Sequence, residues 1–178
     1  MVSSSEPSLT KLPTLSTYLE AMQHLLAFVL QIPPIDPSGP LRTTFLLRLT
    51  GDVMNSVPGY LPDIYDLQRL LDFLDDLDQA WVTVLKSQVW DPSAGEGVDL
   101  FVSVEMIEPG KPIRSTPVSQ TERTRLRSLL VTGTEGLEEW LGTPGEDYQP
   151  ALARAGLMQG FDDLFTMTLA EMGSLSEP

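Results

Sequence analysis

Four aspartates form the densest group of carboxylates in the sequence: Asp72, Asp75, Asp76 and Asp78. On a helix the first three would share one face, because residues three and four positions apart are neighbours there. Such a face could hold a metal ion, bind a basic partner, or be solvated opposite an apolar stripe. A carboxylate metal site in a helical bundle usually has Glu-x-x-His partners on facing helices, and the sequence contains none. The basic partner and the solvated face therefore remain as alternatives.

The other residues that could do chemistry are few. The chain has no cysteine and a single histidine, His24, which excludes cysteine nucleophiles, disulfides and thiolate metal sites and leaves little for Ser-His-Asp chemistry. His24 stands among apolar residues, which is typical of the boundary of a helix face, and Asp162-Asp163 is typical of a solvated helix side. Because no phosphate-binding glycine motif is present either, we predict no enzyme, no cofactor, no metal and no small-molecule ligand.

Charge is distributed unevenly along the chain. Segment 111–127 has five basic residues against one acid, a net charge of +4, and the rest carries −18 of the total of −14. The acidity disfavours nucleic acid and anionic membranes; it favours basic protein partners or serves only solubility. No aromatic residues stand between the arginines, as single-strand binding would require. We therefore predict that Arg114, Arg123, Arg125 and Arg127 bind an acidic protein segment, of a partner or of the chain itself.

A regular apolar spacing predicts three helices in the first half of the chain. They cover residues 17–32, 40–56 and 62–89, with Thr17 and Glu20 as a capping box for the first. In the second, Leu41 and Phe45 belong to the predicted apolar face and Arg42 does not. The third has an apolar stripe over five turns that includes Trp81, so we expect it to be central to the fold.

The residues that follow alternate between apolar and polar, which is typical of a strand. Val98, Leu100, Val102 and Val104 point one way in this pattern, within a short extended segment at 98–105. No second strand is visible to pair with it, and unpaired backbone groups must be satisfied elsewhere. We interpret the segment either as a docking element that adds to a partner's sheet or as extended chain packed on the bundle.

The second half is predicted as a loop at 108–118 and further helices. Ser119 and Glu122 form a capping box for a helix to about Leu130; Gly133 and Gly136 are expected to end it before a short helix that contains Trp140. A last helical stretch begins at Pro150 and is kinked or split at Gly156 and Gly160. The predicted fold is all-α: an irregular antiparallel bundle of five or six helices, in one domain at 14–173 between flexible segments 1–13 and 174–178.

Two further features could serve interactions or their control. Trp90 and Trp140 are predicted at helix ends, where tryptophan is either partly exposed and available to a partner or buried against the bundle. Thr116-Pro117 lies in the predicted loop beside Arg114 and has the form that proline-directed kinases recognise; the alternative is an unmodified loop. The predicted partner-binding residues are Trp90, Val98, Leu100, Val102, Arg114, Arg123, Arg125, Arg127 and Trp140.

The predicted function is a non-enzymatic one. We expect a protein–protein interaction subunit or adaptor of a larger assembly; the alternative is an acidic escort for a basic client such as a histone or ribosomal protein. The absence of cysteine favours an intracellular setting, either cytoplasmic or nuclear. The N-terminal residues lack the basic and apolar pattern of a secretory signal, and no apolar run is long enough to cross a membrane.

Overall fold

The computed structural model describes residues 12–102, 108–142 and 149–174. The predicted terminal segments, 1–13 and 174–178, fall almost wholly outside these residues, and so do Val104 of the extended segment and residues 143–148.

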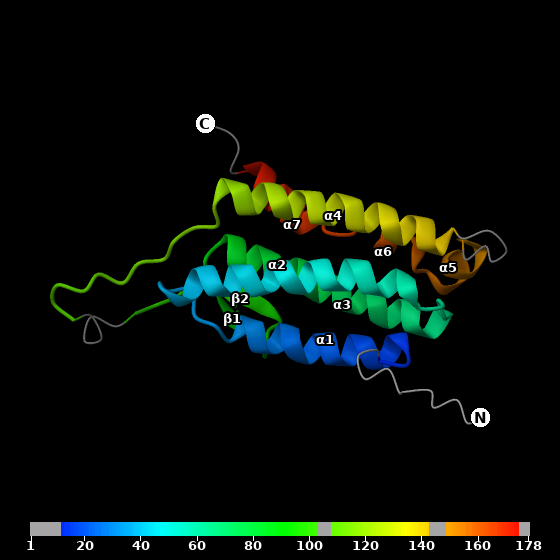
Figure 1. Cartoon of the computed structure of the whole chain (residues 1–178), viewed down its shortest axis with the longest axis horizontal. Coiled ribbons are helices and arrows are strands. Elements are labelled where there is room, and N and C mark those ends of the chain that lie inside the picture. The colour runs from blue at the N-terminus through cyan, green and yellow to red at the C-terminus, as the bar shows by residue number, and fades with distance from the viewer. Residues whose placement is uncertain (1–11, 103–107, 143–148, 175–178) are drawn as a thin grey trace, which may run out of the picture.

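The chain folds as an all-α bundle with one small two-stranded sheet, which confirms the predicted fold class. In chain order the elements are α1 (Leu15–Leu30), α2 (Ser38–Ser56), a 3₁₀ turn η1 (Val57–Gly59), α3 (Ile64–Leu85), β1 (Val89–Asp91), β2 (Glu96–Val98), α4 (Gln120–Leu141), α5 (Gln149–Ala155), α6 (Met158–Asp162) and α7 (Thr166–Ser174). The four long helices lie along the long axis of the molecule (Figure 1). α1 contacts α2 and α3, α4 packs on α2, and α7 packs on α3.

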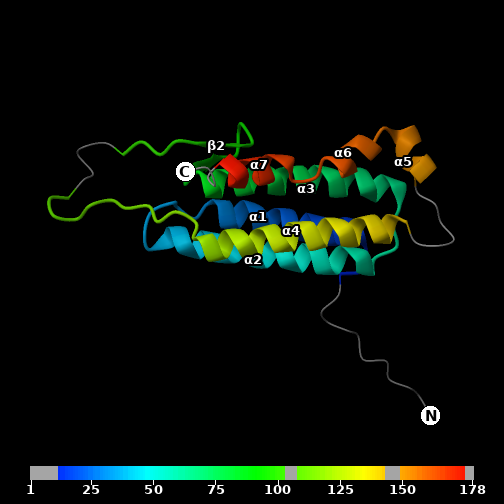
Figure 2. The same ribbon diagram turned by 90° about the horizontal axis from the view of Figure 1, so that it is seen from above.

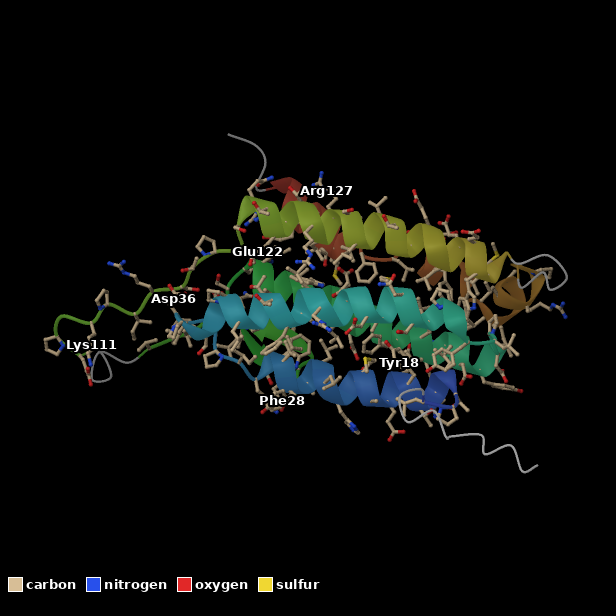
Figure 3. The ribbon with its side chains drawn as sticks, viewed as in Figure 1. Tyr18, Phe28, Asp36, Lys111, Glu122 and Arg127 are labelled. Atoms are coloured by element: carbon tan, nitrogen blue, oxygen red, sulfur yellow. The ribbon has the colours of Figure 1, made fainter. Side chains whose placement is uncertain are left out.

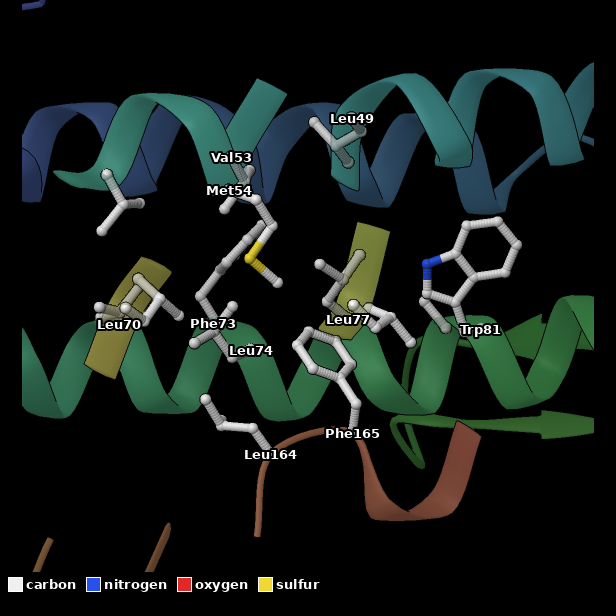
Figure 4. Close-up of a cluster of buried hydrophobic side chains, with 14 of the residues drawn as sticks. Leu49, Val53, Met54, Leu70, Phe73, Leu74, Leu77, Trp81, Leu164 and Phe165 are labelled. Atoms are coloured by element: carbon white, nitrogen blue, oxygen red, sulfur yellow. The ribbon is translucent and has the colours of Figure 1, made fainter. Parts of the chain in front are cut away.

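Helix α3 is the central element. Asp63 caps its N-terminus by accepting a hydrogen bond from the Tyr65 N–H at 3.0 Å. Its apolar residues are buried on two sides, because α2 covers one side and the chain before α7 covers the other (Figure 4). Trp81 is 0% exposed, as the stripe predicted, and its indole N–H donates to Thr50 Oγ1 of α2 at 3.0 Å.

Asp78 is a buried polar residue of α3 that holds α7. Its Oδ1 accepts hydrogen bonds from the Thr168 N–H at 2.8 Å and the Thr168 hydroxyl at 2.5 Å, and its Oδ2 accepts from the Met167 N–H at 3.3 Å. These amides belong to the first turn of α7, where backbone donors have no partner within the helix. Asp78 therefore caps a helix that is remote in sequence and is not part of the solvated acidic face.

Two of the predicted helix boundaries are wrong. α1 begins at Leu15 because Thr14, with Thr17 three residues on, forms the capping box; Thr17 and Glu20 do not. α3 ends at Leu85, because Ser87 adopts a left-handed backbone with φ 53°, which a helix cannot continue.

The predicted apolar face of α2 is confirmed at Leu46, Leu49 and Val53, which are buried, and is wrong in the first turns of the helix. Arg42 is only 2% exposed, whereas Leu41 and Phe45, which were assigned to the apolar face, are exposed. α2 contacts α1 and α3 and also carries α4, so the buried part of its surface is set by three neighbours. Arg42 Nη1 donates to the Gln88 carbonyl oxygen at 2.7 Å just beyond the end of α3, and burial lowers the pKa of its guanidinium to about 10.

The predicted break in the fourth helix is absent. α4 runs without interruption from Gln120 to Leu141, and Ser119 and Glu122 form its capping box as predicted. Gly133 is buried against α2: a Cβ there would lie 2.6 Å from Met54 Cγ and Sδ. The glycine therefore permits close packing of two helices and does not end one. By contrast, Gly156 adopts φ +73° after α5, and the last stretch divides into three short helices.

The predicted strand at 98–105 is wrong except at Val98, because residues 99–102 lie outside any strand; residues 103–105 fall outside the described residues. β1 and β2 form an antiparallel hairpin in which Val89 pairs with Val98, Trp90 with Gly97, and Asp91 with Glu96. The expectation that Trp90 ends a helix is wrong, since it lies in β1. Of the predicted docking residues, Val98 is thus paired within the chain, and Leu100 and Val102 follow β2 outside the sheet.

Replacement of Trp81 tests the central position of α3. Trp81→Ala removes a fully buried ring and its hydrogen bond to Thr50, so we expect a loss of about 3–5 kcal/mol in the free energy of unfolding, measured by urea denaturation. A loss under about 1 kcal/mol would mean that the residue lies at the surface.

The two glycines of α4 provide a matched pair. Gly133→Ala should destabilise the protein by about 1–3 kcal/mol, because the new methyl group would displace Met54. Gly136→Ala should stabilise it by up to about 1 kcal/mol, because a Cβ there meets nothing within 4 Å and alanine favours helix. Thermal unfolding measures both changes in stability. Equal changes in the two variants would contradict the close packing of α2 on α4.

Candidate interaction surface

An apolar pocket opens at the end of the bundle where the hairpin lies. Its volume is about 290 Å³, and it lies between the end of α1, the following loop, β1 and the residue after the hairpin. The lining residues are Ala27, Leu30, Gln31, Ile32, Pro33, Pro34, Val89, Trp90, Pro92 and Leu100. Trp90 is half-buried and, among the described residues, is the only aromatic side chain that lines this pocket.

Two exposed aromatic residues follow pocket-lining residues in the sequence. Phe28, next to the lining residue Ala27, is 66% exposed and points away from the bundle (Figure 3). Phe101, next to the lining residue Leu100, is 90% exposed. Adjacent large apolar side chains that remain in water mark interaction sites more often than single ones do.

A long arm leaves the bundle at the same end. We define the arm as residues 99–118, of which 99–102 and 108–118 are described; it projects past the hairpin and returns to the start of α4 (Figure 2). Gln88 Nε2 donates to Asp99 Oδ1 at 3.0 Å and ties down the outgoing part, in which Val102 is half-buried. The returning part carries Ile113, which is exposed, and Lys111 and Arg114.

The arm is fastened to the loop between α1 and α2. The Asp36 N–H donates to the Arg114 carbonyl oxygen at 2.8 Å, and the Ser115 hydroxyl donates to the Pro34 carbonyl oxygen at 2.6 Å. The Asp36 carboxylate accepts two more hydrogen bonds, from the Thr116 N–H at 3.1 Å and the Thr116 hydroxyl at 2.6 Å. We call these four hydrogen bonds the latch; Asp36 lies at the root of the arm in Figure 3.

The four predicted arginines do not form one cluster. Arg114 lies on the arm at the latch, and Arg123 and Arg127 line a recess of α4 with Met172 of α7. Arg125 lines a different recess, with Leu129. The described residues place no carboxylate within ion-pair distance of any of these four guanidinium groups, although Arg123 Nε donates to the Val118 carbonyl oxygen at 3.1 Å.

Trp140 is not available to a partner. It is only 7% exposed, and its indole N–H donates to the Tyr60 carbonyl oxygen at 2.9 Å. The continuous α4 places Trp140 against the turn after α2, so of the two alternatives given for Trp140 the buried one holds.

The acidic face of α3 borders a polar recess beside α1. Asp72 accepts a hydrogen bond from Gln68 Nε2 at 2.8 Å, and Asp76 accepts one from Gln23 Nε2 at 3.1 Å. Partial burial raises the pKa of Asp75, and the charges of Asp72, Asp78 and Asp76 raise it further. Partial burial and the charge of Asp72 also raise the pKa of Asp76, against the lowering effect of the Gln23 hydrogen bond.

The described part of the chain was compared with the requirements of metal binding, of histidine chemistry and of membrane crossing. It contains no group of three or more His, Asp or Glu side chains placed to hold a metal ion. His24 is exposed on α1. Across the described ranges, no helix combines the length and apolar composition that a membrane crossing requires.

Sequence reasoning missed two features of this surface, Phe28 and the latch residue Asp36. Phe28 interrupts the polar side of α1, and that departure from the amphipathic pattern was a usable signal. Asp36 lies in a proline-rich loop 80 residues from Thr116, and nothing in the local sequence indicates their contact.

Comparisons with known proteins give no match: no family model, no curated protein and no solved structure resembles the chain.

Because the pKa of Asp75 is raised, replacement of its carboxylate should stabilise the folded protein, and the size of this effect should depend on pH. An acid whose pKa is higher in the folded state binds extra protons there, so stability falls as pH rises through the window above its usual value. Asp75→Asn should therefore stabilise the protein at pH 7 by a few tenths of a kcal/mol, because exposed charges are screened, and have no effect near pH ~3.

Urea denaturation at both pH values measures this difference. Glu139→Gln, which removes one exposed carboxylate from α4, serves as the control for net charge. Equal effects of the two substitutions at pH 7 would contradict a local repulsion on α3.

Proposed function

We propose that this chain is a non-enzymatic interaction subunit or adaptor of an intracellular complex, and that it binds a partner protein with the hairpin end of the bundle. The observation that carries the proposal is the 290 Å³ apolar pocket, together with the exposed rings of Phe28 and Phe101, which follow the lining residues Ala27 and Leu100 in the sequence. Aromatic side chains supply much of the binding energy of protein interfaces, and pockets beside them receive apolar side chains of the partner.

The side chains of the arm favour a protein partner that has both apolar and acidic side chains. Ile113 is exposed on it, and Arg114 is unpaired among the described residues. A partner segment with apolar side chains for the pocket and carboxylates for Arg114 matches this surface in both respects. The small number of titratable groups around the pocket and the composition of the chain favour binding over catalysis.

The acidic escort is the second candidate, and a different surface favours it. Asp72, Asp75 and Asp76 make no ion pair with any described basic residue, and their mutual repulsion contributes to the raised pKa values. A basic client would relieve that repulsion. The two functions thus use different surfaces, the hairpin end for the adaptor and the acidic face of α3 for the escort, and can be separated by substitution.

Affinity capture followed by a binding measurement tests the proposal. The partner is captured from the native cells with the tagged full chain, and its affinity is measured by calorimetry. Phe101→Ser should weaken binding roughly thirtyfold, because it removes an exposed aromatic anchor without disturbing the core.

Leu61→Ser is the matched control, since Leu61 is also 90% exposed but precedes α3 at the opposite end of the bundle (Figure 1). It should change the affinity less than twofold. If Phe101→Ser binds normally while Asp72→Asn and Asp76→Asn abolish a salt-sensitive interaction, the adaptor proposal is wrong and the escort is favoured.

A further inference from the structure

The latch holds a hydroxyl group whose sequence context suits a modification. Thr116 is followed by Pro117, and the only other Thr-Pro dipeptide of the chain is Thr143-Pro144; there is no Ser-Pro. Thr143 lies outside the described residues. The Thr116 hydroxyl donates to Asp36 Oδ2 at 2.6 Å and is thus one of the four bonds that fasten the arm.

We propose that Thr116 is a phosphorylation site for a proline-directed protein kinase, and that its phosphate opens the latch and releases the arm from the loop between α1 and α2. The site is new with respect to the proposed function and does not depend on the identity of the partner.

The local structure suits a kinase substrate. Residues 111–117 are exposed and outside any helix or strand, so no regular structure has to unfold before they can enter a kinase cleft. The latch consists of hydrogen bonds at or near the surface, and such bonds stabilise a structure only modestly because water competes for the same groups. Transient opening therefore gives the kinase access to the hydroxyl.

The transfer itself is ordinary phosphoryl transfer from ATP. Thr116 Oγ1 forms a bond to the γ-phosphorus, the bond between that phosphorus and the β–γ bridging oxygen breaks, and ADP leaves. The hydroxyl proton passes to a carboxylate of the kinase. The product keeps no donor on Oγ1.

The phosphate reverses the electrostatics of the latch. In the unmodified chain a hydroxyl donates to the Asp36 carboxylate; after transfer a group of charge about −1.5 to −2 stands at the same position. Two anions at hydrogen-bond distance repel each other, and the carboxylate also loses the donor that satisfied it. The neighbouring Arg114, which has no ion pair among the described residues, provides a better partner for the phosphate.

Amide hydrogen exchange of the Asp36 N–H is a direct readout, because this group donates to the Arg114 carbonyl oxygen across the latch. The full chain with Thr143→Ala is treated with a proline-directed kinase and MgATP, the site is confirmed by mass spectrometry, and exchange is followed by NMR. We expect phosphorylation of Thr116 and roughly tenfold faster exchange at Asp36, the effect of losing about one net hydrogen bond.

Two variants separate charge repulsion from loss of the hydroxyl. Thr116→Val removes the donor without adding charge and should accelerate exchange less than the phosphate does. In Asp36→Asn the repulsion is absent, and the side-chain amide can donate to a phosphate. Phosphorylation of that variant should therefore leave exchange at residue 36 within about twofold of its unphosphorylated form.

Either of two results would overturn the proposal. In the first, the kinase fails to modify Thr116 in the folded chain, whether or not it modifies a peptide of residues 111–121. In the second, Thr116 is phosphorylated but exchange at Asp36 is unchanged, which would mean that the latch tolerates the phosphate.

Discussion

The structure depends on the burial of α3 on two opposite sides. On one side Trp81 packs against α2 and donates its indole hydrogen to Thr50; on the other, Asp78 accepts hydrogen bonds from the first turn of α7. Burial of a carboxylate costs free energy unless donors satisfy it, and Thr168 supplies both an amide and a hydroxyl. The same helix thus joins the N-terminal helices and the short C-terminal helices into one packed unit.

This arrangement determines which surfaces are left for function. The middle of the bundle is occupied by its own packing, as the burial of Trp140 and the contact of Gly133 with Met54 illustrate. The hairpin end is different, since α3 terminates there at Leu85 and the chain leaves the bundle for the arm. Phe28 and Phe101 are exposed near this end, and the latch fastens the arm to the loop between α1 and α2.

Elements with a long sequence pattern could be predicted, and elements with a short pattern could not. The stripe of α3 repeats over several turns, so its helix and the burial of Trp81 were predictable. β1 has only three residues, too few for an alternation to be recognised, so the strand that pairs with Val98 was not predicted. Arg42 was predicted on the solvent side of its helix because the apolar periodicity takes account only of apolar side chains. Its burial depends instead on a hydrogen bond to a carbonyl group at the end of α3. Gly133 was predicted to end the helix because the local sequence does not show the contact that requires a glycine there, the close approach of Met54 on another helix.

In the proposed function the hairpin end, and not the acidic face of α3, contacts the partner. Hydrogen exchange of the chain, free and in complex with its captured partner, measures this most directly. We expect protection on binding in residues 28–34, 89–102 and 108–116, with residues 68–76 unchanged. Protection confined to residues 68–76 and the facing part of α1, with free exchange at the hairpin and the arm, would contradict the proposed function.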